Sequence, residues 1–104
     1  MAAYSVSAIA GQRLDEIFHY VRASWGDAQA EANIRGLFDC FDQIAGRQIV
    51  GRAIAADFEV DGNYHRHEHH FIYWKVLTTG SVGIVTILHE RMHQMDRFKD
   101  DAGN

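Results

Sequence analysis

Two runs of apolar and β-branched residues in the C-terminal third, separated by a short polar turn, form the clearest pattern in this chain. They cover residues 71–77 and 82–88, and Thr78 to Ser81 lies between them. Runs of this kind on either side of a turn predict a β-hairpin. In the first run, strict alternation would place Ile72, Trp74 and Val76 on one face and Phe71 and Tyr73 on the other. In the second run, one face would carry Val82, Ile84, Thr86 and Leu88, and the other Val85 and Ile87. Because both faces are apolar, we expect helices to cover one face and a partner to cover the other.

The N-terminal half changes to helical periodicity after a short alternating strand over residues 4–7. The apolar stripe of the first predicted helix consists of Leu14, Ile17, Phe18, Val21 and Trp25, with Trp25 expected to pack against the helical layer. Ser7 is the expected N-cap and Gly26 the expected C-cap. A second helix with Asp27 as its expected cap carries Ile34, Leu37, Phe38, Phe41 and Ile44, and ends at Gly46. The short connection predicts an antiparallel helical hairpin.

The remaining segments are less regular. Residues 53–60 are compatible with a strand that has Ile54, Ala56 and Phe58 on one face, and Asp61-Gly62-Asn63 is a turn signal. Tyr64 then begins a histidine-rich strand. Beyond residue 89 the tail is polar, with apolar residues three apart at Met92, Met95 and Phe98, and residues 99–104 are expected to fray.

The element order is therefore strand, helix, helix and then three or four strands. Consecutive helices and mostly consecutive strands predict an α+β fold, with a small antiparallel-rich sheet and the N-terminal helical hairpin on one face. We expect residues 1–104 to form a single domain, in which the first strand pairs near the C-terminal hairpin.

Composition narrows the classes of function. The net charge of −4 disfavours direct binding of nucleic acid, because proteins that grip phosphate backbones usually carry a strong basic excess. No apolar run approaches the roughly 20 residues of a membrane span, and no signal peptide is evident at the N-terminus. The single cysteine, Cys40, excludes an intramolecular disulfide and fits a reducing cytoplasm, and its simplest interpretation is a small buried apolar residue.

Several short segments, in this order and spacing, resemble the ParE branch of the RelE/ParE toxin superfamily. They are Tyr4-Ser5-Val6-Ser7 with Ala10, Leu14-Asp15-Glu16-Ile17 with Tyr20, Trp25-Gly26 with Gln29-Ala30, Gly51-Arg52, His70-Phe71-Ile72-Tyr73-Trp74, and Ile84 to Met92. The last segment is the most specific, since it is similar to the closing strand of the family. The resemblance extends from Tyr4 to Met92 and implies a strand-helix-helix-strand-strand-strand fold.

What the resemblance implies for function is a cytoplasmic toxin of a type II toxin–antitoxin module, without enzymatic activity or a cofactor. Its partners would be a ParD-like antitoxin, which neutralises it, and DNA gyrase as the target. By resemblance, the candidate target contacts are Arg91, Met92, Met95 and Phe98. The candidate antitoxin contacts are Phe18, Trp25 and Trp74, although tryptophans in such positions are more often core residues.

The cluster His65, His67, His69 and His70 raises a metal hypothesis. In one continuous strand, His65, His67 and His69 would share a face with neighbours about 6–7 Å apart, which zinc could accept. No cysteine or carboxylate pattern completes such a site, so we expect no metal and interpret the cluster as a solvated strand face. Exposed imidazoles there would make contact with a partner sensitive to pH.

The alternative function is that of a RelE-like, ribosome-dependent mRNA endonuclease. Attack by a 2′-hydroxyl needs a base, an acid and a cation on the phosphate. The side chains available for these roles are His70, Tyr73, His89, Arg91 and His93. The acidic net charge and the presence of lysine only at positions 75 and 99 argue against this alternative.

Overall fold

The computed structural model describes residues 4–54 and 62–89. Its first helix, α1 (Ala8–Trp25), begins after Ser7, whose Oγ accepts a hydrogen bond from the backbone N–H of Ala10 at 3.0 Å. Gly26 ends α1 with a φ of 94°, a conformation that glycine adopts without steric cost. The predicted caps at both ends of the first helix are therefore confirmed.

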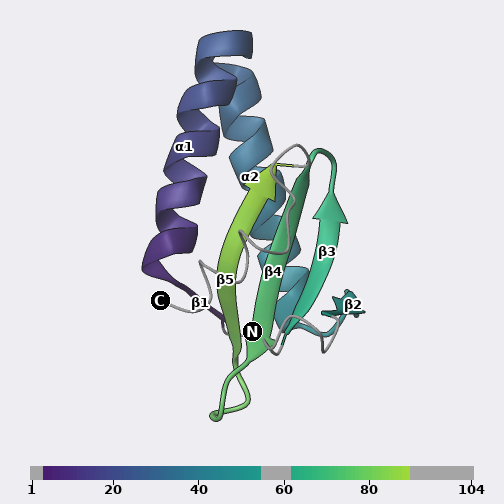
Figure 1. Ribbon diagram of the computed structural model, residues 1–104. Coiled ribbons are helices and arrows are strands. Elements are labelled where there is room, and N and C mark those ends of the chain that lie inside the picture. The colour runs from purple at the N-terminus through teal and green to yellow at the C-terminus, as the bar shows by residue number, and fades with distance from the viewer. Residues whose placement is uncertain (1–3, 55–61, 90–104) are drawn as a thin grey trace.

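The second helix, α2 (Asp27–Ala45), follows after this one residue and ends at Gly46, as predicted. The predicted cap Asp27 is wrong by one position. Gly26 itself is the N-cap, and Asp27 is the first helical residue. Its carboxylate still lies in the first turn, where it interacts favourably with the positive end of the helix dipole. The two helices run side by side as the expected hairpin (Figure 1).

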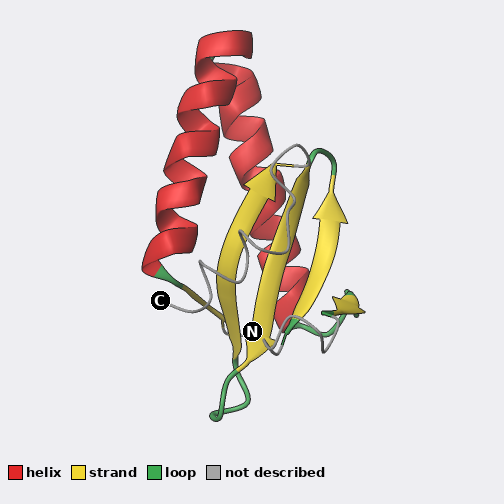
Figure 2. Cartoon of the chain, in the orientation of Figure 1, coloured by secondary structure: helices red, strands yellow, loops and turns green. Residues whose placement is uncertain are grey.

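The sheet has five strands in the order β1-β5-β4-β3-β2. Their bounds are β1 (Tyr4–Val6), β2 (Arg52–Ala53), β3 (Asn63–His67), β4 (His70–Val76) and β5 (Val82–His89). β1 pairs with β5 in parallel, and the other neighbours are antiparallel. Both helices lie on one side of the sheet, so the predicted α+β architecture is confirmed (Figure 2). None of the described helices is long and apolar enough to cross a membrane.

A β-bulge in β5 corrects the predicted alternation. Tyr73 of β4 lies opposite Thr86, but the next residue, Trp74, lies opposite Ile84, so Val85 is an extra residue on β5. Each extra residue exchanges the two faces of a strand beyond it. Val82 and Ile84 therefore share the helix-facing side with Ile87, whereas Leu88, predicted to share a face with Val82 and Ile84, lies on the opposite side.

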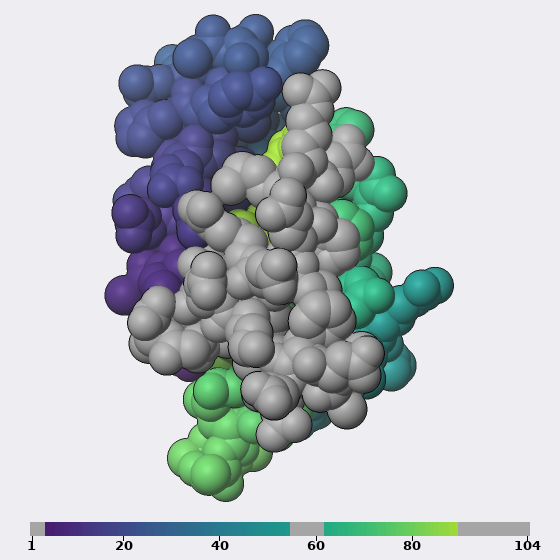
Figure 3. Space-filling model, in the orientation of Figure 1, coloured from purple at the N-terminus to yellow at the C-terminus, as the bar shows by residue number. Residues whose placement is uncertain are grey.

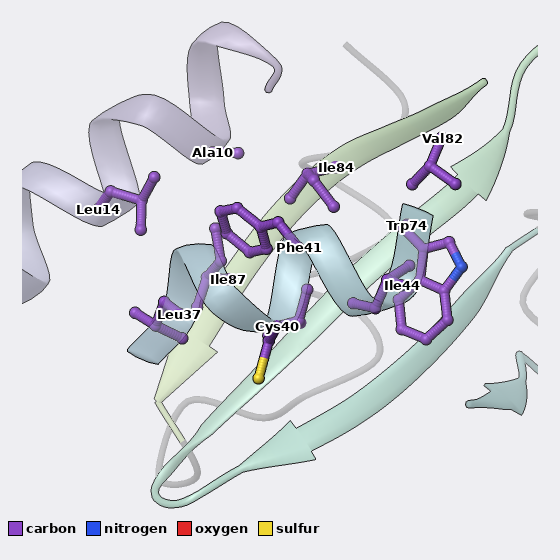
Figure 4. Packing of buried hydrophobic residues seen from close by; sticks show 11 residues of the cluster. Ala10, Leu14, Leu37, Cys40, Phe41, Ile44, Trp74, Val82, Ile84 and Ile87 are labelled. Carbon is purple, nitrogen blue, oxygen red and sulfur yellow. The ribbon is translucent and has the colours of Figure 1, made fainter. Parts of the chain in front are cut away.

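The main core lies between the helices and the sheet (Figure 4). Phe41 of α2 is fully buried and packs with Ile84 and Ile87 of β5. Trp74 is 3% exposed and lies beside Ile44 at the other end of the same cluster. This layer buries Leu14 of α1 and Leu37, Phe41 and Ile44 of α2, and it accounts for the position of both helices over the sheet.

The opposite face of the sheet is not the open apolar surface that the sequence suggested. Ile54, Tyr73 and Leu88 form a second cluster there, with exposures of 8%, 0% and 1%. The rings of Tyr64 and Phe71 pack around this cluster. In the described part of the chain, the most exposed large apolar side chains on the helices are instead Tyr20, Trp25 and Phe38.

Part of the irregular segment is also described. β2 stops at Ala53, and the backbone N–H of Ile54 donates to the carbonyl of Gly62 at 3.0 Å. The predicted strand positions Ala56 and Phe58 and the tail from residue 90 onward lie outside the described residues.

Candidate functional site

A groove of about 1020 Å³ runs between α1 and the adjoining end of the sheet, and we call it the α1–sheet groove. One wall is α1 and the other is formed by the β3–β4 turn together with the facing ends of β4 and β5. α2 contributes the uncharged Gln29 and Asn33. The groove thus joins the helical layer to the sheet, and its two walls differ in chemistry.

The α1 wall is largely apolar and aromatic. Ile17, Tyr20, Val21 and Trp25 recur at helical spacing along it. Trp25 is 73% exposed and Tyr20 is 65% exposed, so the prediction that Trp25 packs against the helical layer is wrong. Trp25 is the last residue of α1, next to the helix–helix connection, and the described structure leaves most of its ring accessible. Exposed aromatic side chains beside a groove are typical of sites that bind another protein.

The sheet wall is polar and rich in histidine. His70 at the start of β4 lies opposite His89 at the end of β5, and their ring centroids are 5.3 Å apart in an edge-to-face arrangement. The ring of His69, in the β3–β4 turn, stacks against His89 with centroids 6.4 Å apart. Glu68 precedes this group in the same turn. Three imidazoles therefore meet at this end of the groove, and Glu68 lies in the adjoining turn.

A charged pair on α1 also lines the groove. Arg13 Nη1 is 3.4 Å from Glu16 Oε2, and the Arg13 side chain is only 14% exposed. Because Glu16 is already engaged by Arg13, this pair contributes little net charge to the groove.

A second groove of about 820 Å³ lies on the other side of α1, and we call it the α1–α2 groove. Phe18 of α1, Phe38 of α2 and Val6 of β1 line it. The three candidate antitoxin contacts therefore do not form one surface. Phe18 lines the α1–α2 groove and Trp25 the α1–sheet groove, whereas Trp74 is a core residue and presents no surface to a partner in this structure.

The histidine cluster does not form the continuous strand face that the sequence suggested. β3 ends at His67, and Glu68, with a φ of 54°, turns the chain back into β4. His69 therefore lies in the turn, outside the face shared by His65 and His67.

Two of these histidines also depart from a fully solvated face, because His67 is partly buried and His70 is buried. His67 faces α2, with Nδ1 3.2 Å from the Sγ of buried Cys40, and His70 is 7% exposed. Burial, and then the positive charge of His67, lower the pKa of His65. Burial, followed by Asp39 and Glu68, raises the pKa of the Cys40 thiol, so it is not an activated nucleophile. Within residues 4–54 and 62–89, no three histidine, cysteine or carboxylate groups are placed to hold a metal ion.

The residues of the endonuclease alternative are only partly brought together. His70 and His89 are neighbours on the helix-facing side, but Tyr73 lies on the opposite face of the sheet. Burial, and then the neighbouring Tyr64, raise the pKa of Tyr73 far above its usual range, which opposes proton transfer by its hydroxyl. Arg91 and His93 lie outside the described residues, as do the other candidate target contacts Met92, Met95 and Phe98.

Sequence reasoning did not identify the groove itself. It assigned Ile17 and Val21 to the core stripe and gave no role to Arg13 or Asn33. A signal was present, since Tyr20 widens the apolar surface of α1 beyond what one packed stripe requires. The meeting of His69, His70 and His89 depends on the tight turn at Glu68 and on the pairing of β4 with β5, which local sequence does not reveal.

Comparison with known proteins agrees with this architecture. A family model described as the ParE toxin of the type II toxin–antitoxin system parDE matches residues 4–94. Toxin ParE1 of Mycobacterium tuberculosis is 31% identical over 91 residues, which cover 86% of this chain and 90% of the relative. Toxin ParE of Escherichia coli is 31% identical over 100 residues, 96% of each chain.

The fold also matches a solved structure. A chain from the structure of the chromosomal ParDE system of P. aeruginosa superposes with a TM-score of 0.71 at 15% identity, covering 86% of this chain and 96% of that one. At that identity the match supports the fold alone, whereas the family model and the two relatives establish the protein family. This chain belongs to the ParE toxin family of type II toxin–antitoxin systems.

Proposed function

We propose that this chain is a cytoplasmic toxin that inhibits DNA gyrase by binding it, without enzymatic activity, and that a ParD-like antitoxin neutralises it. Membership of the ParE family supports the toxin role. The separation of Tyr73 from His70 argues against the alternative, a RelE-like mRNA endonuclease. We assign the target contacts to the C-terminal set Arg91, Met92, Met95 and Phe98.

The observation that carries the antitoxin part of the proposal is the exposed aromatic wall of the α1–sheet groove. Trp25 and Tyr20 expose most of their surface beside Ile17 and Val21. A segment of the antitoxin that covers them would gain roughly 25 cal/mol for each Å² of apolar surface removed from water. This gain would offset the cost of ordering an antitoxin segment that is disordered before it binds.

Affinity measurements with variants in the two grooves test this placement. An antitoxin candidate, sought as the product of a reading frame that adjoins the toxin gene, is purified and titrated against the toxin. We expect Trp25→Ala to weaken binding at least tenfold, because buried tryptophans at interfaces commonly contribute more than about 2 kcal/mol. Phe38→Ala, in the α1–α2 groove, is the matched control and should change the dissociation constant less than threefold. The opposite pattern would move the antitoxin to the α1–α2 groove.

A supercoiling assay with purified gyrase tests the target. The toxin should inhibit supercoiling, and a stoichiometric amount of antitoxin should restore it. In parallel, translating ribosomes with a reporter mRNA should show no codon-linked cleavage on addition of the toxin. Uninhibited gyrase together with cleaved mRNA would replace the proposed function by the endonuclease alternative.

A further inference from the structure

The end of the molecule opposite the helix–helix connection carries exposed basic and aliphatic side chains. It is formed by the segment between α2 and β2, by the last residues of β4 and by the β4–β5 turn (Figure 1). We call this surface the basic end, and its side chains are Arg47, Val50, Arg52, Lys75 and Val76, all of them exposed. Val50 is 84% exposed, more than any other large apolar side chain in the described part of the chain.

Strand pairing brings two of the cations to one face of the sheet. Arg52 of β2 lies opposite Tyr64 of β3, which in turn lies opposite Tyr73 of β4. Lys75 follows Tyr73 by two residues and therefore shares its face. Strand spacing and rise place the Cα atoms of Arg52 and Lys75 roughly 12 Å apart.

The two valines lie on the other side of the same end. Val50 adjoins Gly51, whose added Cβ would lie 2.6 Å from Cζ2 of Trp74. Val76 follows Trp74 by two residues on the helix-facing side of β4, and it is 50% exposed. The basic end thus combines cations and aliphatic surface from three separate segments.

The charge of the basic end has one sign. Residues 46–54 and 74–83 contain three basic residues and no acidic one, whereas α2 contains four carboxylates and one arginine. The ion pairs among the described residues join α1 to itself and to the start of α2. No carboxylate in the described part of the chain pairs with a cation of the basic end.

Arg47 occupies a position where glycine is usual. It follows the C-cap of α2 with a φ of 64°, in the left-handed conformation that commonly ends a helix. Its Nη2 donates to the carbonyl of Gly80 in the β4–β5 turn at 3.2 Å. A guanidinium has five N–H donors, and this is the one acceptor that the described residues provide. The exposed arginine is therefore anchored at the turn and retains donors for a carboxylate from outside.

This combination of groups suits an acidic protein surface better than a nucleic acid. Binding to a phosphate backbone depends on a dense array of cations, and exposed aliphatic side chains gain nothing from phosphate. A protein segment with carboxylates and an aliphatic residue would meet the unpaired cations and also cover Val50 and Val76. Charge of one sign would in addition accelerate the encounter with an oppositely charged partner.

We propose that the basic end is a second contact with DNA gyrase and binds an acidic segment of its surface that carries an aliphatic side chain. This inference rests on the proposed function and adds the chemistry of the target surface. An antitoxin segment that fills the α1–sheet groove lies at the start of β4 and the end of β5. The basic end lies at the other end of these strands and stays accessible to the target.

The test measures binding of the full toxin chain to immobilised gyrase holoenzyme by surface plasmon resonance. We expect Arg52→Glu/Lys75→Glu to weaken binding at least about tenfold, because each reversed charge repels the acidic segment. The matched control Arg22→Glu/Arg35→Glu makes the same change of net charge on the helices. It should stay within about threefold, because charge distant from the contact is screened by salt. Raising the salt concentration from about 50 to about 200 mM should weaken binding of the unmodified toxin and narrow its advantage over the first variant.

A variant of the aliphatic part distinguishes a protein partner from a nucleic acid. Val50→Ser should weaken binding to gyrase about fivefold, through loss of buried apolar surface. It should leave the melting temperature unchanged, because Val50 is exposed. The unmodified toxin should not bind a DNA duplex in a fluorescence anisotropy titration. Binding to DNA that is lost in Arg52→Glu/Lys75→Glu would overturn the inference in favour of a nucleic-acid contact.

Antitoxin affinity and melting temperature of the same variants control for folding. Both should match those of the unmodified toxin in Arg52→Glu/Lys75→Glu. Gyrase binding that this variant and its matched control retain equally would overturn the inference while the proposed function stands. A loss of antitoxin affinity with gyrase binding intact would also overturn it, since the antitoxin would then occupy the basic end. Failure of the unmodified toxin to bind gyrase would overturn both the inference and the proposed target.

Discussion

At the scale of single residues, the space beside Gly51 is occupied by the ring of Trp74. Gly51 has a φ of 73°, a left-handed conformation that costs a residue with a side chain about 1–2 kcal/mol. A Cβ atom at this position would also lie 2.6 Å from Cζ2 of Trp74 and 2.9 Å from the carbonyl oxygen of Tyr64. Gly51 therefore lets the chain pass over the tryptophan that closes the main core.

Replacing this glycine should destabilise the fold through both effects. We expect Gly51→Ala to lower the free energy of unfolding by roughly 2–4 kcal/mol, the sum of backbone strain and displacement of a packed ring. Gly80→Ala is the matched control, because Gly80 has a φ of 87° but no atom within 4 Å of its added Cβ. Gly80→Ala should therefore lower the free energy of unfolding only by the contribution from backbone strain. Urea unfolding of the three proteins measures the difference, and equal losses in both variants would mean that contact with Trp74 is unimportant.

At the scale of elements, Ser7 joins β1 to α1 and connects both to β5. Its Oγ accepts the N-terminal hydrogen bond of α1 and also donates to the carbonyl of Val85 at 2.7 Å. Its backbone N–H donates to the carbonyl of Ile84 at 3.0 Å. One hydroxyl thus caps the helix and satisfies the extra residue of the β5 bulge, so the start of α1 and the bulge stabilise each other.

Loss of this hydroxyl should cost more than loss of an ordinary surface serine. We expect Ser7→Ala to lower the free energy of unfolding by about 1–2 kcal/mol, from the lost cap and the unsatisfied carbonyl. Ser5→Ala, at an exposed position of β1, should stay within about 0.5 kcal/mol of the unmodified protein. Thermal and urea unfolding provide the comparison. A Ser7 variant as stable as the Ser5 variant would show that neither hydrogen bond contributes.

The same elements show what the sequence could and could not predict. Ser7, Gly26 and Gly46 mark helix ends by their own chemistry, so both helices were predicted almost to the residue. The turn at Glu68 was missed because no glycine, asparagine or proline marks it. The bulge at Val85 was missed because nothing local distinguishes it from the flanking strand residues, and its position depends on pairing with β4.

At the scale of the whole molecule, the helical hairpin and the β4–β5 loop project at opposite ends (Figure 3). The α1–sheet groove lies along the helical hairpin, where Trp25 and Tyr20 are exposed. The candidate target contacts, in contrast, follow β5 in the chain. The sequence suggested both sets of residues but not the division between grooves, because it could not show that Trp74 is in the core and Trp25 at the surface.

Because the proposed antitoxin contacts and the candidate target contacts belong to different parts of the chain, we expect that toxicity and neutralisation can be separated. A chain truncated after His89 lacks Arg91, Met92, Met95 and Phe98 but keeps every described helix and strand. We expect it to lose growth arrest and gyrase inhibition while it binds the antitoxin within about threefold of the full chain. Toxicity, antitoxin affinity and melting temperature are measured on the same protein. Unchanged toxicity would exclude these four residues as target contacts, and a joint fall of melting temperature and antitoxin affinity would mean that the tail contributes to the core.

The parallel pairing of β1 with β5 has a consequence for the order of folding during synthesis. Ser7 and its hydrogen-bond partner Val85 are 78 positions apart in the sequence. Closing so long a loop is entropically costly, and contacts of this kind form late. While the chain is being translated, β1 has no strand to pair with, and the hydroxyl of Ser7 has no bulge carbonyl to satisfy, until β5 has left the ribosome. A chain terminated before β5 therefore cannot complete the sheet, and the shape that we associate with toxicity arises only after β5 has been synthesised.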